Sequence, residues 1–241
     1  MKVLGLDTAT EACSAALAMD GAVIERYEVL GRGHAERLLP MVQELLAEAG
    51  VALAALDAVA FGRGPGGFTG LRIAAGVTQG LAFGAGLPVV PVSDLAALAA
   101  RAATLRGARW VLPCLDARMA QVYWAAYDCA DPASPVPLTP DRVSDPGDLA
   151  AALEKWEKGD GTLFRTPEEG PVSFFGAGHG YSGYPALAGM LGERLAGVDA
   201  GLLPHAREVA LIGARAAHEG RTVPAEAAVP VYLRDEVAHR R

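Results

Sequence analysis

Apolar positions in the first part of the chain form short runs and longer segments with helical spacing. The short runs predict strands at Val3–Leu6, Cys13–Ala18, Val23–Val29, Ala58–Phe61 and Val89–Pro91. The longer segments predict helices at about Ala35–Glu48, Gly70–Ala85 and Asp94–Ala103. An Asp20-Gly21 pair suits a tight hairpin turn between the second and third strands. Because Pro40 lies inside the first helix, we expect that helix either to kink or to start late.

The second part of the chain repeats this order of elements around a differently built core. Only four of the fifteen aromatic residues precede position 105. Strands are predicted at Trp110–Leu115, Gln121–Tyr127 and Val172–Gly176, and helices at Asp148–Trp156, Tyr184–Leu195 and Arg207–Glu219. Hairpin strands followed by alternating helix and strand therefore occur twice, which predicts two related α/β lobes. We place them at residues 1–104 and 105–241, with room for the helix over 207–219 to pack back on the first lobe.

Composition and charge narrow the class of protein. The 241 residues are 51% hydrophobic and 20% charged, which is typical of a folded globular chain. The net charge of −7 has the wrong sign for gripping a nucleic-acid backbone over a broad surface. Cys13, Cys114 and Cys129 form no CxxC pair, and prolines and glycines interrupt the apolar run Ile73–Val92. We therefore expect a cytoplasmic protein with reduced core cysteines and no membrane segment.

A glycine-rich stretch follows the predicted strand Ala58–Phe61. Gly62-Arg63-Gly64-Pro65-Gly66-Gly67 satisfies the GxGxxG spacing with which a dinucleotide pyrophosphate meets backbone amides at a helix N-terminus. The acidic residue expected about 20 positions further on is missing, because nothing acidic lies between Asp57 and Asp94. The pattern therefore favours a tight structural turn over a dinucleotide site.

The first predicted strand ends in Asp7-Thr8-Ala9-Thr10, a second candidate for nucleotide chemistry. A carboxylate followed by hydroxyls at a strand end is a common setting for phosphate binding with its hydrated metal ion. Ala9 stands where such a turn usually has glycine, and its Cβ would crowd a phosphate. We interpret Asp7, Thr8 and Thr10 as a degenerate nucleotide-site turn.

The predicted helix Gly70–Ala85 is the most informative segment, because apolar residues surround its axis. Gly76, Gly80 and Gly84 form a stripe of small residues that permits close approach of another helix. Burial inside its own lobe and burial of one face against a second protein both fit this pattern. The second interpretation predicts a partner interface shared with the helix Ala35–Glu48. Its residues are Leu38, Met41, Val42, Leu45, Gly70, Ile73, Ala74, Val77, Gly80, Leu81 and Gly84.

The remaining polar residues assemble into no catalytic motif. The five histidines are scattered, and the chain lacks the GxSxG and HExxH patterns. Asp116-Ala117-Arg118 follows a predicted strand and is compatible with an acid beside a base. An ion pair that positions a loop is the favoured interpretation.

Several motifs in combination resemble the bacterial TsaB (YeaZ) family over residues 1 to about 234. They are Asp7-Thr8-Ala9-Thr10, His34 with Pro40, the stretch Gly62–Ile73, Asp116-Ala117-Arg118 and Pro230-Val231-Tyr232-Leu233-Arg234. The family motif loop comprises Gly62, Arg63, Gly64, Pro65, Gly66, Phe68 and Thr69. Gly67 and Ala75 depart from the Ser and Gly of many members. The resemblance implies the α/β fold of actin-like ATPases (the ASKHA fold), built from two ribonuclease-H-like lobes.

The resemblance also implies a role in tRNA modification. It suggests a subunit required for N6-threonylcarbamoylation of adenosine 37 in tRNAs that read codons beginning with A. Such a subunit pairs with and activates the catalytic subunit TsaD, with the ATPase TsaE joining, and forms a homodimer when alone. ATP would be used through these partners, tRNA would be contacted mainly through the complex, and no cofactor would be bound tightly.

A comparison with TsaD supports a non-catalytic interpretation. TsaD carries a metal-binding HxxxH after the strand equivalent to Val89–Val92, and here Asp94 and Leu98 stand at the two histidine positions. These side chains do not form an iron or zinc site. Two alternatives remain open at this point, namely a stand-alone enzyme of the same fold (metallopeptidase-like or a small-molecule kinase) and a structural homodimer.

Overall fold

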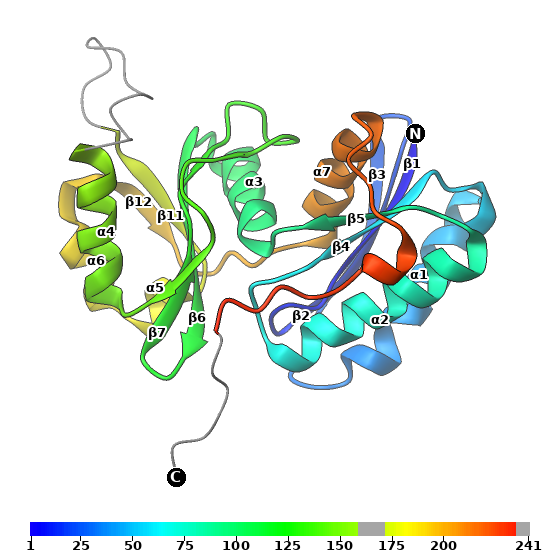
Figure 1. The fold of residues 1–241 in the computed structure, drawn as a ribbon, viewed down its shortest axis with the longest axis horizontal. Coiled ribbons are helices and arrows are strands. Elements are labelled where there is room, and N and C mark those ends of the chain that lie inside the picture. Colours follow the sequence, from blue (N-terminus) through cyan, green and yellow to red (C-terminus); the bar gives the residue numbers. More distant parts are fainter. Residues whose placement is uncertain (159–171, 235–241) are drawn as a thin grey trace.

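The computed structural model describes residues 1–158 and 172–234, which form two α/β lobes side by side (Figure 1). Lobe I contains a five-stranded sheet in the order β3-β2-β1-β4-β5. Its strands are β1 (Lys2–Asp7), β2 (Ala12–Met19), β3 (Ala22–Val29), β4 (Ala58–Gly62) and β5 (Val89–Val92). The strands β1, β2 and β3 are antiparallel neighbours, whereas β4 and β5 run parallel to β1.

Helices cover both faces of this sheet. Helices α1 (His34–Ala49) and α2 (Phe68–Ala85) pack on one face, and α7 (Ala206–His218) returns from the far end of the chain to pack on the other (Figure 1). The close approach of α7 to β1 requires glycine, because a Cβ at Gly5 would lie 2.5 Å from the carbonyl oxygen of Ala206. Helix α1 begins at His34 and runs through Pro40, so a late start is excluded.

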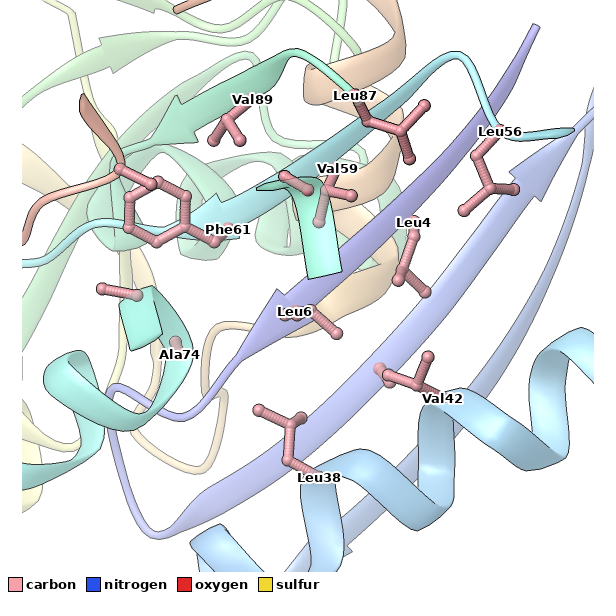
Figure 2. Packing of buried hydrophobic residues seen from close by; sticks show 14 of the residues in the cluster. Leu4, Leu6, Leu38, Val42, Leu56, Val59, Phe61, Ala74, Leu87 and Val89 are labelled. Carbon is pink, nitrogen blue, oxygen red and sulfur yellow. The ribbon is translucent and has the colours of Figure 1, made fainter. Parts of the chain in front are cut away.

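The main core of lobe I lies between the sheet and the two helices α1 and α2 (Figure 2). Alternate residues of each strand point into it, as the two-residue period of a strand requires. Leu4, Leu6 and Phe61 from the sheet have no exposed surface, and Leu38 and Leu45 from α1 are equally buried. The opposite strand positions carry mostly small residues, which lets α7 lie close to the sheet.

Lobe II repeats the strand order of lobe I, as β10-β7-β6-β11-β12. Its strands are β6 (Trp110–Arg118), β7 (Gln121–Trp124), β10 (Arg142–Ser144), β11 (Phe174–Ala177) and β12 (Leu195–Asp199), with a side pair β8 (Tyr127–Asp128) and β9 (Val136–Pro137). Its helices are α4 (Pro146–Lys158), α5 (Gly180–Gly183) and α6 (Ala186–Leu191). The repeated order and strand directions identify two ribonuclease-H-like lobes of the ASKHA fold, as expected.

Helix α3 (Asp94–Arg106) lies between the two sheets (Figure 1). Its buried residues contribute to the core of lobe II and to the layer beneath α7 in lobe I. Short 3-10 turns occupy Leu53–Ala55, Gly192–Arg194 and Ala225–Ala227. No helix in the part of the chain that the structure describes is long and apolar enough to cross a membrane.

Two sequence predictions in lobe II were wrong in detail. The segment predicted as a helix at Tyr184–Leu195 contains the shorter helix α6, which ends at Leu191 and is followed by a 3-10 turn, and Leu195–Asp199 is the strand β12. The strand predicted over Gln121–Tyr127 is divided, because Ala125 and Ala126 leave the ladder between β7 and β8.

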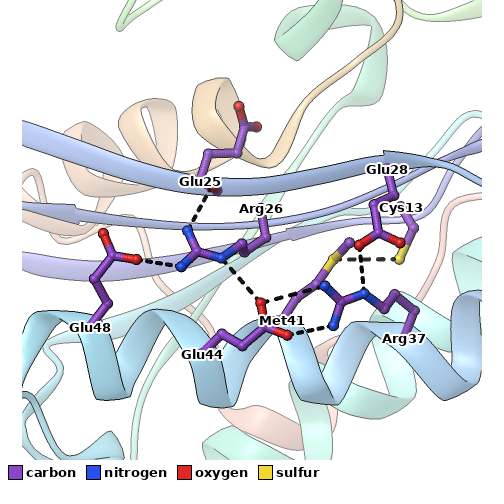
Figure 3. Close-up of polar contacts among 8 residues, drawn as sticks. All are labelled: Cys13, Glu25, Arg26, Glu28, Arg37, Met41, Glu44 and Glu48. Atoms are coloured by element: carbon purple, nitrogen blue, oxygen red, sulfur yellow. Dashed lines mark hydrogen bonds and ion pairs between the residues drawn. The ribbon is translucent and has the colours of Figure 1, made fainter.

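An ion-pair network joins the edge strand β3 to α1 (Figure 3). Glu44 accepts from Arg26 Nε at 3.1 Å and from Arg37 Nη1 at 2.6 Å, and Arg37 also bonds Glu28. Glu48 bonds the other side of Arg26. The Arg37 guanidinium lowers the pKa of the Glu44 carboxyl. The network therefore holds the outermost strand of the sheet against the helix.

Candidate functional site

A cleft of about 1000 Å³ separates the lobes. Lobe I contributes the turn after β1, the start of α1 and the loop that leads into α2, and lobe II contributes the β6–β7 hairpin and the end of α5. The lining segments are residues 8–11, 31–36, 65–71, 115–118, 182–183 and 231–234. The predicted nucleotide turn, the motif loop and the Asp116-Ala117-Arg118 motif are thus brought together at one place.

The turn after β1 is closed from within. Asp7 has no exposed surface, and its Oδ1 accepts a hydrogen bond from the backbone N–H of Ala9 at 2.8 Å. Thr8 is also buried, and its hydroxyl donates to the carbonyl oxygen of Gly70 at 2.7 Å. Thr10 is half-buried and its Oγ1 accepts from the N–H of Ala12. The carboxylate is therefore turned away from the cleft.

The motif loop covers this turn. The N–H of Gly67 donates to the carbonyl oxygen of Ala9 at 2.7 Å. A Cβ at Gly66 would lie 2.5 Å from the same oxygen, and a Cβ at Gly70 would overlap the carbonyl oxygen of Thr8. These glycines let one backbone pass directly over another, which is the tight structural turn predicted from the sequence.

Other residues of the motif loop anchor it to three neighbours. The N–H of Arg63 donates to Val92, and its carbonyl oxygen accepts from the N–H of Val231 in the tail. The Arg63 guanidinium lies 3.7 Å from Asp141 of lobe II. Gly62, Gly64 and Pro65 are buried, whereas Phe68 and Thr69 are exposed at the cleft.

The interior oxygen of Asp7 faces Asp94, the first residue of α3. Burial raises the pKa of Asp7, although hydrogen bonds from Asp94 and Ala9 oppose the shift. Burial, and then the nearby charge of Asp7, hold the pKa of Asp94 well above its usual range. Leu98, the second residue at a TsaD histidine position, is buried in the core of lobe II. No group of three or more His, Cys, Asp and Glu among residues 1–158 and 172–234 is placed to hold a metal ion.

Asp116 and Arg118 on the lobe II side form the ion pair favoured by the sequence analysis, at 3.1 Å. The N–H of Asp116 donates to His179 Nδ1 at 2.9 Å, so the proton of this imidazole is on Nε2, 3.8 Å from Glu11 of lobe I. Burial lowers the pKa of His179, and Glu11 and Asp116 oppose that shift. From the sequence His179 is one of five scattered histidines, and its separation of 63 positions from Asp116 gives no sign of the contact.

The tail Pro230–Arg234 crosses from one lobe to the other. Arg72 Nε donates to the hydroxyl of Tyr232 at 3.0 Å, and the guanidinium also lies over the ring of Phe68. Arg234 Nη2 donates to Gln121 Oε1 at 2.7 Å on the β6–β7 hairpin. The tail motif is therefore a link between the α2 end of lobe I and the hairpin of lobe II.

The predicted partner interface divides into buried and exposed residues. Leu38, Met41, Val42, Leu45 and Ala74 are at most 2% exposed and belong to the core of lobe I, so no surface is left for a partner. This part of the prediction was wrong, because helical spacing of large apolar residues marks the face that packs on the sheet. The half-buried members are Gly70, Ile73, Val77 and Leu81, and the exposed members are Gly80 and Gly84.

Helix α2 has one face that the rest of this chain does not cover, so it is not wholly buried within its own lobe. A Cβ at Gly76, Gly80 or Gly84 would meet nothing within 4 Å, and the Phe83 side chain is 79% exposed. The result is a shallow apolar strip with an exposed phenyl ring on a folded lobe.

Comparisons with known proteins agree on one family. The chain matches the family model "TsaD: tRNA N6-adenosine threonylcarbamoyltransferase" over residues 27–241. It is 39% identical over 241 residues to the "tRNA threonylcarbamoyladenosine biosynthesis protein TsaB" of Escherichia coli, covering 100% of this chain and 98% of that relative. A protein of the same name from Haemophilus influenzae is 51% identical over 125 residues, which are 52% of this chain and 53% of that relative.

A solved structure extends the match to three dimensions. "YeaZ from Pseudomonas aeruginosa" superposes with a TM-score of 0.82 at 45% sequence identity, covering 96% of this chain and 99% of that one. Sequence and fold are therefore similar over nearly the whole length of both proteins. The chain belongs to the TsaB (YeaZ) family, within the range of the TsaD family model.

Proposed function

We propose that this chain is a non-catalytic subunit required for N6-threonylcarbamoylation of adenosine 37 in tRNAs that read codons beginning with A. It pairs with and activates a TsaD-type catalytic subunit in the cytoplasm, and a TsaE-type ATPase joins the pair. Without TsaD it forms a homodimer. The observation that carries the proposal is the contrast between a closed nucleotide turn and an open apolar helix face in the same lobe.

The closed turn supports the non-catalytic part of the proposal. Phosphoryl chemistry in such a cleft depends on a carboxylate and free backbone donors that reach the phosphates and their metal ion. Here Asp7 is buried, and the N–H of Ala9 bonds to Asp7 itself. The motif loop also occupies the space above Ala9 through Gly66 and Gly67. In this proposal ATP enters through the partner subunits, and tRNA is contacted mainly through the complex.

The open face of α2 supports the pairing part. An exposed phenyl ring at Phe83 beside Gly80 and Gly84 offers a partner helix both a close approach and an apolar contact. Half-buried Ile73, Val77 and Leu81 border the strip. A partner that covers it would remove most of the apolar surface of this helix from water.

The pairing is tested with Gly80→Arg and a matched control. Both Gly80 on α2 and Gly189 on α6 are exposed helical glycines whose added Cβ would meet nothing within 4 Å. Each arginine variant should therefore fold and melt like the parent. A cation forced into a desolvated helix crossing costs several kcal/mol, and each ~1.4 kcal/mol is tenfold in affinity. We expect Gly80→Arg to weaken TsaD binding at least a hundredfold and Gly189→Arg to leave it unchanged.

Calorimetric titration with purified TsaD measures this binding, and threonylcarbamoylation of tRNA by the reconstituted system measures its consequence. If folded Gly80→Arg binds TsaD as tightly as the Gly189→Arg control, the α2 face is not the pairing surface. The stand-alone enzyme is tested separately, by ATP turnover and peptide cleavage with the purified chain. Turnover abolished by Asp7→Ala would contradict the non-catalytic assignment.

A further inference from the structure

Asp7 and Asp94 meet in the interior of lobe I, where β1 ends and α3 begins. Neither residue has exposed surface. One oxygen of each is satisfied by the backbone, because Asp7 Oδ1 accepts from the N–H of Ala9 and Asp94 Oδ2 accepts from the N–H of Gly64. The other oxygens, Asp7 Oδ2 and Asp94 Oδ1, find no N–H or O–H donor in the described part of the chain.

The two unsatisfied oxygens lie against the same point of the backbone. A Cβ at Gly62 would overlap Asp94 Oδ1 and would lie 3.2 Å from Asp7 Oδ2. The glycine therefore leaves room for the two buried carboxyl groups to face the same point, where each raises or lowers the pKa of the other. Two carboxylates are both acceptors, so a hydrogen bond between these oxygens requires that one of the two groups carry a proton.

The charged groups around the pair do little to stabilise two ionised carboxylates. The ionisable groups around the pair include Cys13 on β2, Glu25 and Tyr27 on β3, His205 before α7, Asp141 before β10 and Arg63 in the motif loop, whose guanidinium lies 3.7 Å from Asp141. Glu25 and Asp141 oppose a second charge, His205 favours one, and the charge of Arg63 is paired with Asp141. Two ionised carboxylates in contact inside a dry core would be strongly destabilising.

We propose that Asp7 and Asp94 form a carboxylic acid–carboxylate pair that binds one proton in the folded protein, as a structural site for a proton instead of a metal ion. The pair links three segments, since Asp94 also donates its own N–H to the carbonyl oxygen of Gly64 at 3.1 Å. It therefore fixes the end of β1 and the start of α3 to the motif loop. This inference rests on the geometry of lobe I and is independent of the proposed pairing function.

The first test is the pH dependence of unfolding. A group whose pKa is higher in the folded than in the unfolded state loses stability as pH rises through that interval. In Asp94→Asn the amide oxygen still accepts from Gly64 and its NH₂ donates to Asp7, so the contact survives without a titratable proton. As the pH rises from 5 to 9, the melting temperature of Asp94→Asn should therefore increase relative to that of the parent. The increase should be roughly 3–5 °C for each unit by which folding raises the pKa of the carboxyl pair.

The control is Asp20→Asn, which neutralises an exposed carboxyl at the hairpin turn between β2 and β3. Its melting temperature should stay parallel to that of the parent over the same pH range. If Asp94→Asn also stays parallel to the parent, the pair holds no extra proton and the proposal is wrong.

The double variant Asp7→Asn/Asp94→Asn tests whether the two side chains share a hydrogen bond. Asp7→Asn and Asp94→Asn each leave one donor facing one acceptor, so both single variants should remain folded at pH 8. In the double variant both amide oxygens are held by Ala9 and Gly64, and two NH₂ groups face each other. It should melt well below either single variant, and additive behaviour would overturn the shared hydrogen bond.

Two further measurements separate a proton from a cation. The infrared spectrum of the parent at pH 7 should contain the C=O stretch of a protonated carboxyl, and Asp94→Asn should lack it. Adding millimolar Mg²⁺ or Ca²⁺ at pH 8 should leave the melting temperature of the parent unchanged relative to the variant. A selective rise for the parent would show that a metal ion, and not a proton, belongs between the two carboxyl groups.

Discussion

The two lobes have the same strand order, yet the hairpin after the first strand is buried in one lobe and exposed at the cleft in the other. In lobe I this hairpin contains Asp7, which is fully buried beneath the motif loop. In lobe II it contains Asp116, which lies at the cleft and pairs with Arg118. The cleft of this chain is therefore closed at the β1–β2 turn of lobe I and open at the β6–β7 hairpin of lobe II.

This difference between the two hairpins arises from the segment that follows the fourth strand of each sheet, β4 in lobe I and β11 in lobe II. After β4 the chain makes a glycine-rich loop over residues 63–67, and Gly66 in this loop and Gly70 in the first turn of α2 lie directly on the backbone of the β1 turn. After β11 it makes a short corner at Gly178, and His179 binds the N–H of Asp116. One topology thus supports a filled site or an accessible one, depending on loop length and on where glycine permits contact.

The largest effect should come from opening the closed side with Gly70→Ala. The new Cβ would overlap the carbonyl oxygen of Thr8, so either the turn or α2 must move. Backbone overlap of this kind costs about 2–4 kcal/mol, which exceeds the helix-propensity gain of about 1 kcal/mol. The net loss of about 1–3 kcal/mol should lower the melting temperature by roughly 2–12 °C in calorimetry.

Gly76→Ala is the matched control for that change. It lies on the same helix, and its Cβ would meet nothing within 4 Å. It should be neutral or slightly stabilising, because only the propensity term remains. Equal stability of the two alanine variants would show that the motif loop does not rest on the turn as described.

Much of lobe I, including the closed turn at its cleft side, could be predicted from the sequence. The five strands of lobe I follow from short apolar runs, and the missing acid after the GxGxxG pattern correctly pointed to a structural turn. The contacts of Asp7 with Asp94 and of Asp116 with His179 were out of reach, because each joins residues far apart in the chain. The strand β12 was missed because a short edge strand containing Gly197 has little periodic signal.

The second-largest loss of stability should come from Arg234→Ala, which removes the link between the tail and the β6–β7 hairpin of lobe II. Arg234 contacts Gln121, Met119 and the carbonyl oxygen of Ala117, so the variant loses charged hydrogen bonds at a half-buried site. Such bonds contribute about 1–2 kcal/mol, and the melting temperature should fall by roughly 2–6 °C. Gln121→Ala in the Arg234→Ala background should add little, and a full additional loss would show that the two residues act independently.

A smaller, pH-dependent effect should come from His179 on the open side. Its pKa is lowered by burial, so the folded protein binds fewer protons than the unfolded chain just below the ordinary pKa of about 6.5. Stability should therefore fall as pH drops below that value. An NMR titration of the imidazole should give a midpoint below about 6.5, and a midpoint above that value would contradict the buried contact with Asp116.

The smallest effect concerns the third strands, where the lobes also differ. In lobe I the strand β3 is joined to α1 by the network of Arg26, Arg37 and Glu44, whereas in lobe II the indole of Trp124 donates to Ser144 on β10. Exposed ion pairs are weakened by salt, because the Debye length falls from about 10 Å at 0.1 M to about 3 Å at 1 M. Arg37→Met should therefore melt slightly below the parent in low salt, and the difference should vanish near 1 M NaCl. Trp124→Phe should show the same difference from the parent at every salt concentration. A salt-independent loss for Arg37→Met would mean that the aliphatic stem of Arg37, and not its charge, holds β3 to the helix.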